Sequence, residues 1–118
     1  MVQIGLVLDS RDPEALAPFW ATAPGYVVAG SVEHYVLLLP DGCEGPRLLL
    51  QHVPEDKVAK NRMHLDIEVD DTEAMASKLI ALGATRLKAD VLEEHDCSWI
   101  VMADPEGNEF CLCRARQE

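Results

Sequence analysis

The stretch His64-Leu65-Asp66-Ile67-Glu68-Val69-Asp70 alternates polar and apolar residues. Successive side chains of a β-strand point to opposite faces of its sheet, so the alternation predicts a strand with one polar and one apolar face. Asp71 follows directly and can cap a helix through its carboxylate oxygen. Glu73 then lies where a negative charge stabilises the positive end of a helix. The stretch therefore predicts a strand that leads at once into a helix.

The same pattern occurs once more, near the N-terminus. Residues 3–9 can be laid over residues 64–70 so that apolar residues coincide at every second position. Each copy leads into an acidic helix start, at Asp12 in the first half and at Asp71 in the second. Two copies are too few for a solenoid, which needs about three or more. We therefore predict a pair of related modules within one domain, residues 1–118.

Each module is expected to have the order βαβββ. The helices are predicted to end near Gly25 and Gly83, and Pro18 is expected to kink the first helix or shorten its first turns. The strands predicted after the helices are residues 26–29, 34–39, 47–53, 85–88, 98–103 and 109–114. A tight turn is predicted at Asp104-Pro105-Glu106-Gly107. Module one then spans residues 1–54, a polar linker residues 55–61, and module two residues 62–118.

The composition excludes several classes of partner. The chain has 118 residues, 10 basic and 21 acidic, for a formal net charge of −11. Such a surface repels phosphate backbones and anionic lipid heads, so we expect neither nucleic-acid nor membrane partners. No apolar run approaches the roughly 20 residues of a membrane span, and no export signal is visible. Cys43, Cys97, Cys111 and Cys113 form no CxxC pair, so their spacing does not support a tetra-cysteine zinc site. Without an export signal we expect reduced thiols and a cytoplasmic location.

The polar face of residues 64–70 has two interpretations. On an edge that faces water it is an ordinary solvated stripe, because charged residues are mostly exposed. If the repeated strand faces it across a curved sheet, the polar face lines a cavity. The last predicted strand alternates in the same way, with Phe110 and Leu112 on the core side and Glu109, Cys111 and Cys113 on the other.

Three parts of the chain resemble a known family. Residues 61–71 resemble the opening of the second module of glyoxalase-like proteins, and Asp104-Pro105-Glu106-Gly107-Asn108 resembles their closing hairpin. Phe19-Trp20 followed by Gly25-Tyr26 is similar to the end of their first helix. The chain thus resembles the glyoxalase / bleomycin-resistance / vicinal-oxygen-chelate superfamily. The resemblance implies an α+β fold in which two βαβββ modules form a curved mixed sheet around a cavity. It also implies a homodimer, which covers open sheet edges.

Many members of this superfamily hold a divalent metal on the first and last strands of each module. By this resemblance the candidate ligands are Gln3, His64 and Cys111, with Leu49 or Gln51 at the remaining position. Metal-dependent members usually have glutamate where this chain has Cys111, so the ligand set is incomplete. The candidate ions are zinc, nickel, manganese and iron, and a thiolate ligand would favour zinc.

The resemblance also indicates candidate residues for chemistry and for binding. His64, Asp66 and Glu109 are the candidate catalytic residues, because an isomerase of this type needs an acid–base group beside a carbonyl. Trp20, Gln51 and Trp99 are the candidate substrate-binding residues. In the simpler interpretation, His64 is a hydrogen-bonded cavity histidine, Cys111 a buried filler and Asp66 only an orienting carboxylate. His34, His52 and His95 are expected at the surface.

Two functions follow from these residues. The first is a glyoxalase-like lyase or isomerase that acts on a small carbonyl or hydroxylated metabolite, with or without a divalent metal. The alternative is a metal-free protein that binds and sequesters a small drug or metabolite, as bleomycin-resistance relatives do. No sequence feature specifically supports a third possibility, a ligand-sensing subunit.

Overall fold

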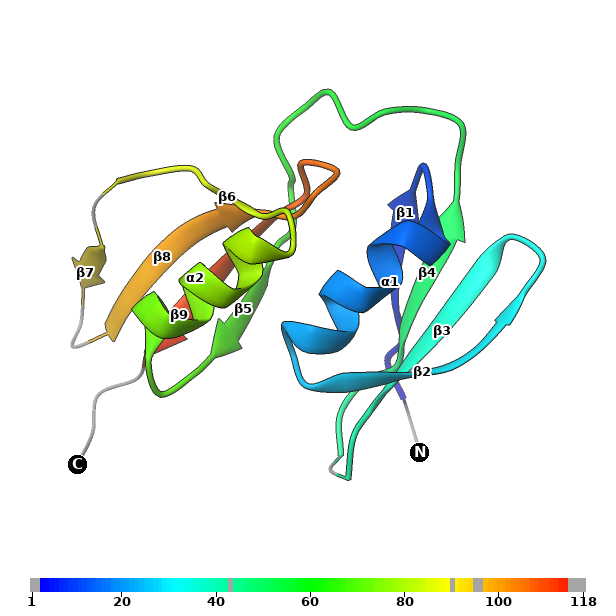
Figure 1. Ribbon diagram of the computed structural model, residues 1–118, viewed down its shortest axis with the longest axis horizontal. Helices are drawn as coiled ribbons and strands as arrows, with labels where there is room; N and C mark the ends of the chain where they lie inside the picture. Colours follow the sequence, from blue (N-terminus) through cyan, green and yellow to red (C-terminus); the bar gives the residue numbers. More distant parts are fainter. Residues whose placement is uncertain (1–2, 43, 90, 95–96, 115–118) are drawn as a thin grey trace. The chain divides into compact units, whose positions relative to one another are not determined.

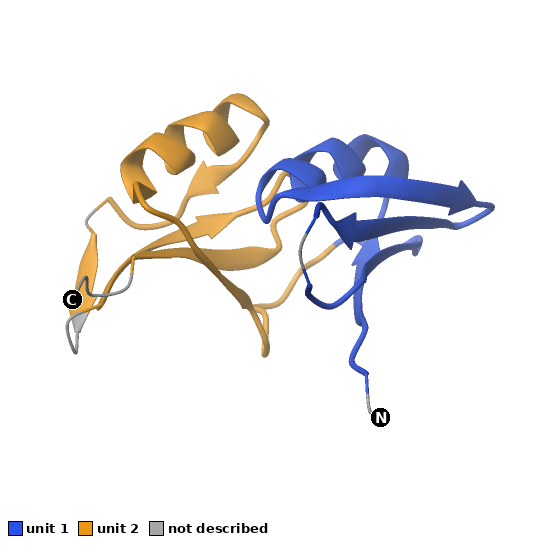
Figure 2. Ribbon diagram, turned by 90° about the horizontal axis from the view of Figure 1, so that it is seen from below, with its two compact units in different colours: residues 1–56 blue, residues 57–118 orange. Residues whose placement is uncertain are grey.

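The computed structural model describes residues 3–42, 44–89, 91–94 and 97–114. The chain forms two compact units, Met1–Asp56 and Lys57–Glu118, which follow the two predicted modules (Figure 2). No helix among the described residues has the length and apolarity to cross a membrane.

Unit 1 is one βαβββ module. Its elements are β1 (Leu6–Ser10), α1 (Pro13–Thr22), β2 (Tyr26–Val32), β3 (Tyr35–Pro40) and β4 (Leu48–His52). The sheet has the order β1-β4-β3-β2. The first and last strands of the unit, β1 and β4, pair in parallel, whereas the other pairs are antiparallel (Figure 1).

Unit 2 repeats this arrangement and adds a short strand. Its elements are β5 (Leu65–Glu68), α2 (Thr72–Ala81), β6 (Thr85–Arg86), β7 (Leu92–Glu94), β8 (Cys97–Ala103) and β9 (Glu109–Arg114). The order is β5-β9-β8-β6, and β7 pairs with β8. Again the first and last strands, β5 and β9, pair in parallel. The predicted α+β fold of two βαβββ modules is confirmed, although β7 was not predicted.

Both helices begin at the predicted residues. The Oδ1 atoms of Asp12 and Asp71 accept hydrogen bonds from Ala15 N and Ala74 N, at 3.2 and 3.0 Å. Each cap satisfies a backbone N–H that has no partner inside the helix. The prediction that Pro18 shortens the first helix was wrong: α1 runs through Pro18, whose side chain is exposed. The missing N–H of an exposed proline leaves one helix hydrogen bond unmade but buries no unsatisfied group.

The helix of each unit packs against one face of its own sheet (Figure 1). The largest fully buried side chains of unit 1 include Leu16, Phe19, Trp20, Leu38 and Leu50. Those of unit 2 include Leu79, Ile100, Met102, Phe110 and Leu112. Because strand side chains alternate, the residues between these core positions point to the sheet face opposite the helix. The candidate residues on β5 and β9 are on this opposite face.

The predicted turn between β8 and β9 is present and is fixed by one buried carboxylate. Asp104 is only 3 % exposed, and its side chain accepts hydrogen bonds from Glu106 N, Asn108 N and Asn108 Nδ2 at 2.9, 2.8 and 2.8 Å. Gly107 has a φ of 89°, a conformation that favours glycine. The turn therefore sets the register with which β9 returns along β8.

Candidate functional site

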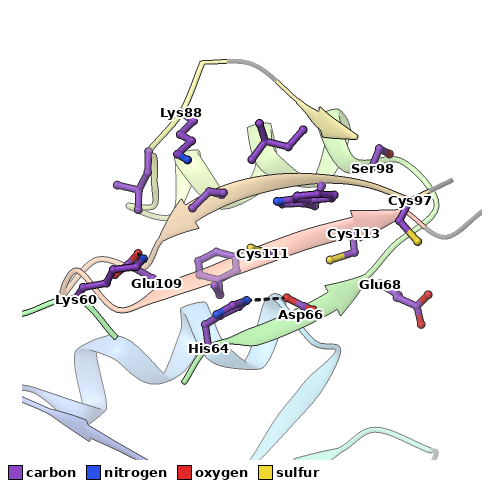
Figure 3. A pocket seen from close by; sticks show the side chains of 15 residues that line it. Lys60, His64, Asp66, Glu68, Lys88, Cys97, Ser98, Glu109, Cys111 and Cys113 are labelled. Atoms are coloured by element: carbon purple, nitrogen blue, oxygen red, sulfur yellow. Dashed lines mark hydrogen bonds and ion pairs between the residues drawn. The ribbon is translucent and has the colours of Figure 1, made fainter. Parts of the chain in front are cut away.

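The helix-free face of the unit 2 sheet carries a pocket of about 780 Å³. Strand register places its residues in rows that cross β8, β9 and β5. One row contains Trp99, Cys113 and Glu68, and the next contains Val101, Cys111 and Asp66. Leu87, Lys88, Leu92 and Cys97 also line the pocket. Figure 3 labels Asp66, Glu68, Lys88, Cys97, Cys111 and Cys113 among the side chains that line this pocket.

His64, Asp66 and Cys111 lie close together among the residues that line this pocket. His64 Nε2 lies 3.2 Å from Asp66 Oδ1, and both side chains are at least half exposed. Cys111 lies beside Asp66 on the neighbouring strand and is 8 % exposed. One nitrogen, oxygen or sulfur atom from each of the three lies within 4.8 Å of the others. The register of β5 and β9 therefore brings together two predicted ligands, His64 and Cys111, and one predicted catalytic residue, Asp66.

Two thiols of the pocket, Cys111 and Cys113, have raised pKa values. Burial and the negative charge of Asp66 raise the pKa of Cys111 above its usual value of 9.0. Burial, Asp66 and neighbouring thiols raise the pKa of Cys113 to about 11. A neutral thiol is a poor nucleophile and a poor metal ligand, so Cys111 becomes a strong donor only when a bound cation displaces its proton.

These three side chains fit a thiophilic divalent ion better than they fit the chelate of metal-dependent relatives. Imidazole, carboxylate and thiolate together suit zinc, and three protein ligands leave one coordination position for substrate or water. A separation of 3.2 Å between His64 Nε2 and Asp66 Oδ1 is compatible with two donors to one ion. The resemblance implied a glutamate on the last strand in metal-dependent members, and this chain has Cys111 at that position of β9. The third predicted ligand, Gln3, belongs to unit 1, where it lines a pocket with Arg47.

Glu109 lines the same pocket but is already bonded. Its carboxylate accepts hydrogen bonds from Lys60 Nζ at 2.6 Å and from Asn61 N at 3.1 Å, and its side chain is 14 % exposed. Its backbone N–H donates in return to Asn61 Oδ1 at 3.1 Å. The bond from Lys60, followed by that from Asn61, lowers the pKa of Glu109. These contacts fix the segment before β5 to β9 and make Glu109 a weaker base than a free carboxylate.

The three predicted substrate-binding residues lie in different environments. Trp99 is half-buried and lines the pocket of unit 2. Trp20 is 2 % exposed and packs edge-on against Phe19, so we interpret it as a core side chain of unit 1. Gln51 is half-buried on β4, where it pairs with Asp9 and Tyr35. Of the three, Trp99 is placed beside His64, Asp66 and Cys111.

Unit 1 has a charged residue that the sequence analysis did not identify. The turn offset indicated Leu49 or Gln51 as the repeat partner of Cys111, but strand register indicates Arg47. Leu6 pairs with Leu48, and its N–H donates to the carbonyl oxygen of Arg47 at 2.9 Å. One position earlier, Gly5 therefore lies beside Arg47, as Asp66 lies beside Cys111. A signal for Arg47 was available in the sequence, since it is two residues before Leu49 and would share its strand face.

The remaining histidines lie outside this pocket or outside the described residues. His34 and His52 are exposed in unit 1, as predicted, with ring centroids 5.9 Å apart. His95 is not among the described residues.

Comparisons with known proteins agree with this fold. Solved structures similar to the chain include a glyoxalase/bleomycin resistance protein/dioxygenase family enzyme from Burkholderia phytofirmans PsJN, with 19 % identity and a TM-score of 0.78 over 93 % of this chain and 95 % of that one. A glyoxalase family protein from Bacillus cereus has 13 % identity and a TM-score of 0.78 over 99 % and 96 % of the two chains. A fosfomycin resistance protein from Listeria monocytogenes has 12 % identity and a TM-score of 0.77 over 98 % and 93 %.

No curated protein matches the chain in sequence. At such low identities the solved structures establish the fold alone, because one fold supports many functions. The sequence profile of the glyoxalase-like domain, however, matches residues 5–113, which include both βαβββ modules. The chain therefore belongs to the glyoxalase-like domain family.

Proposed function

We propose that unit 2 binds a small carbonyl or hydroxylated metabolite and catalyses a lyase or isomerase reaction on it. The observation that carries this proposal is the cluster of His64, Asp66 and Cys111, whose donor atoms lie within 4.8 Å of one another in the pocket. An imidazole, a carboxylate and a thiol in one pocket supply both proton transfer and metal ligation.

His64 is the residue proposed to move the proton. Asp66 Oδ1, at 3.2 Å from His64 Nε2, gives the ring a carboxylate to pair with once it has taken a proton. The half-buried Trp99 and the side chains of Leu87, Leu92 and Val101 would contact the carbon skeleton of the metabolite and exclude water from it. Excluding water strengthens the electrostatic interactions at the reacting atoms.

In a zinc-bound form, His64, Asp66 and Cys111 would instead be the ligands of the ion, because an imidazole nitrogen that binds a metal cannot accept a proton. Such an ion supplies Lewis-acid stabilisation of a developing oxyanion. The chain contributes the ligands and the walls of the pocket. The carboxylate of Glu109 does not compete as a ligand, because it already accepts hydrogen bonds from Lys60 and Asn61.

The metal is tested by its content in protein purified without a chelating tag, measured by inductively coupled plasma mass spectrometry. We expect zinc near one equivalent in the wild type and its loss in His64→Ala and Cys111→Ser. The matched controls are His34→Ala, an exposed histidine of unit 1, and Cys97→Ser, an exposed thiol that lines the same pocket. Both controls should retain the ion. Equal metal content in all five proteins would contradict the proposed ligand set.

The catalytic proposal needs a separate test, because a bound metal does not demonstrate turnover. A panel of small α-hydroxy and α-keto compounds is followed for substrate loss with the wild type, His64→Ala and Asp66→Asn. Removal of a general base typically reduces the rate by about 10²–10⁴. A fully active His64→Ala protein would contradict the assignment of the proton transfer to His64.

A metal-free binding protein is the second candidate function. Trp99 lines the same pocket as the carboxylates of Asp66 and Glu68. An aromatic face and negative charge together suit a small aromatic or cationic compound. Tight binding of such a compound without turnover or metal would favour this function over the first.

We also propose that the protein forms a homodimer. Strand β2 is at an edge of its sheet, and its side chains Val27, Val28 and Val32 are 43, 52 and 70 % exposed. Exposed apolar edges favour pairing with another chain. Sedimentation showing only monomer at micromolar concentration would contradict this proposal.

A further inference from the structure

Two hydrogen bonds hold the backbone of unit 1 at Arg47 and at Pro46, the residue before it. The Arg47 carbonyl oxygen accepts the Leu6 N–H at 2.9 Å, and the preceding Pro46 carbonyl oxygen accepts the Tyr26 hydroxyl at 2.6 Å. Gly45 allows this close approach, since a Cβ there would lie 3.2 Å from Pro40 Cγ and 3.3 Å from the Tyr26 oxygen. The start of the Arg47 side chain is therefore fixed by β1 and by Tyr26.

Gly5 provides the space in which the Arg47 side chain lies. A Cβ at Gly5 would be 2.7 Å from Arg47 Nε and 3.3 Å from both Cγ and Cζ. Any side chain at this position would thus displace the guanidinium group. Gly5 does not have a positive φ, so its backbone conformation does not itself require glycine.

The guanidinium group has no carboxylate partner among the residues that the structure describes. Arg11 and Arg86, in contrast, bond to Asp56 and Glu73. Arg47 is exposed and lies directly before β4, in a chain that has 21 acidic residues and 10 basic ones. Guanidinium presents a planar fork of N–H donors that matches the two oxygens of a carboxylate.

The surroundings of Arg47 limit the kind of anion that fits. A pocket of about 830 Å³ is lined by Gln3, Ile4, Gly5, Leu39, Gly45, Pro46 and Arg47. Among these residues only Gln3 and Arg47 have polar side chains, while Ile4, Leu39 and Pro46 provide apolar walls. Apolar walls suit the hydrocarbon part of an organic acid. A net charge of −11 also favours a singly charged ligand over a phosphate dianion.

We propose that the pocket of Gln3, Gly5 and Arg47 binds the carboxylate group of a small organic acid that has an apolar substituent. Arg47 makes the charge-assisted contact, the Gln3 amide adds a donor, and Ile4, Leu39 and Pro46 contact the substituent. This site lies within unit 1 and does not depend on the function proposed for unit 2.

The test is a titration of the full chain with sodium benzoate at constant ionic strength, followed by the ¹⁵N–¹H signals of the arginine Nε groups and by calorimetry. We expect saturable binding that shifts the Arg47 signal. Arg47→Gln should weaken binding about tenfold or more, the usual effect of losing a hydrogen bond to a charged group. Gly5→Ala should also weaken it, because it displaces the guanidinium without removing it.

The controls distinguish this pocket from the other cationic groups of the chain. Arg11→Gln removes another exposed arginine of unit 1 and should leave benzoate binding unchanged. Benzoate binding that survives in Arg47→Gln, or its absence in the wild type, would overturn the proposal. Inorganic phosphate that binds more tightly than benzoate would overturn the assignment of the anion class. A loss in His64→Ala equal to that in Arg47→Gln would place the carboxylate in unit 2 and overturn the site, whereas unchanged binding there supports it.

Discussion

In unit 1 the first and last strands bring Gly5 beside Arg47, and in unit 2 the equivalent strands bring Asp66 beside Cys111. The two units share the order βαβββ and the parallel pairing of their first and last strands. At these equivalent positions unit 1 has the guanidinium group of Arg47 next to Gly5, which has no side chain. Unit 2 has the carboxylate of Asp66 next to the thiol of Cys111. The repeat thus determines where site residues point, and single substitutions determine which ligands they suit.

The largest expected difference concerns the two tryptophans, one in each unit. Trp20 is 2 % exposed in the core, so Trp20→Ala should lower the free energy of unfolding by about 3–5 kcal/mol. Trp99 is only half-buried, and Trp99→Ala should cost clearly less while it weakens ligand binding in unit 2. Urea unfolding followed by circular dichroism measures both. Equal losses of stability would mean that Trp99 is a core residue like Trp20.

The turns of the two units should differ next. Asp104→Ala leaves two backbone N–H groups and the Asn108 amide without their acceptor, and should cost about 1–3 kcal/mol. In unit 1 the corresponding turn is held by the Tyr26 hydroxyl on Pro46, which is an exposed contact. Tyr26→Phe should therefore cost less than Asp104→Ala in the same urea experiment. The reverse order would show that the turn of unit 1 is the more tightly held.

The thiols of unit 2 should differ in their reaction with iodoacetamide. Because the pKa of Cys113 is raised to about 11, only about one thiol in a thousand is ionised at pH 8. Cys97 is exposed and should be labelled much faster at that pH. The rate at Cys113 should rise about tenfold per pH unit up to its pKa, because only the thiolate reacts. Mass spectrometry of the labelled peptides measures each rate. Equal labelling of Cys97 and Cys113 at pH 8 would contradict the structure.

The smallest expected effect concerns the helix starts. Glu73 of α2 pairs with Arg86 through two bonds of 2.8 and 3.1 Å, which lower its pKa below the ordinary value of 4.5. A lowered pKa stabilises the fold above that value, and the contribution is lost as the pH falls through the lowered pKa. Glu73→Gln should therefore lower Tm slightly at pH 7 and not at strongly acidic pH. Glu14→Gln at the equivalent position of α1 should have a smaller effect at pH 7, since no ion pair is described for Glu14.

Local signals predicted most of the fold. The helix starts follow from the capping residues Asp12 and Asp71, and the turn at Asp104 follows from its own side chain and Gly107. Strand β7 has no such signal, because three residues form a strand there only by pairing with β8. Its existence depends on residues distant in the sequence.

Strand alternation alone predicts which residues of one strand share a face, and this part of the candidate site could be predicted from the sequence. His64 and Asp66 are two positions apart and share a face, so their proximity could be predicted from the sequence. Alternation groups Arg47 with Leu49 and Gln51 on one strand face, but it does not decide which of the three lies beside Gly5, because the pairing of β1 with β4 depends on long-range register. The turn before β4 is longer than the turn before β9. Counting residues from each turn therefore gave Leu49 or Gln51, instead of Arg47, as the position equivalent to Cys111.

A ribosome releases β1 well before β4, and β5 well before β9, yet each pair lies side by side in the finished sheet. Strands β1 and β5 have no other partner in their sheets, so each stays unpaired until the last strand of its unit has emerged. Unit 1 can complete its sheet once residue 52 is free, while unit 2 is still being made. Asp66 and Cys111 meet only when β9 arrives. In the nascent protein the cluster of His64, Asp66 and Cys111 therefore forms only when β9 is in place.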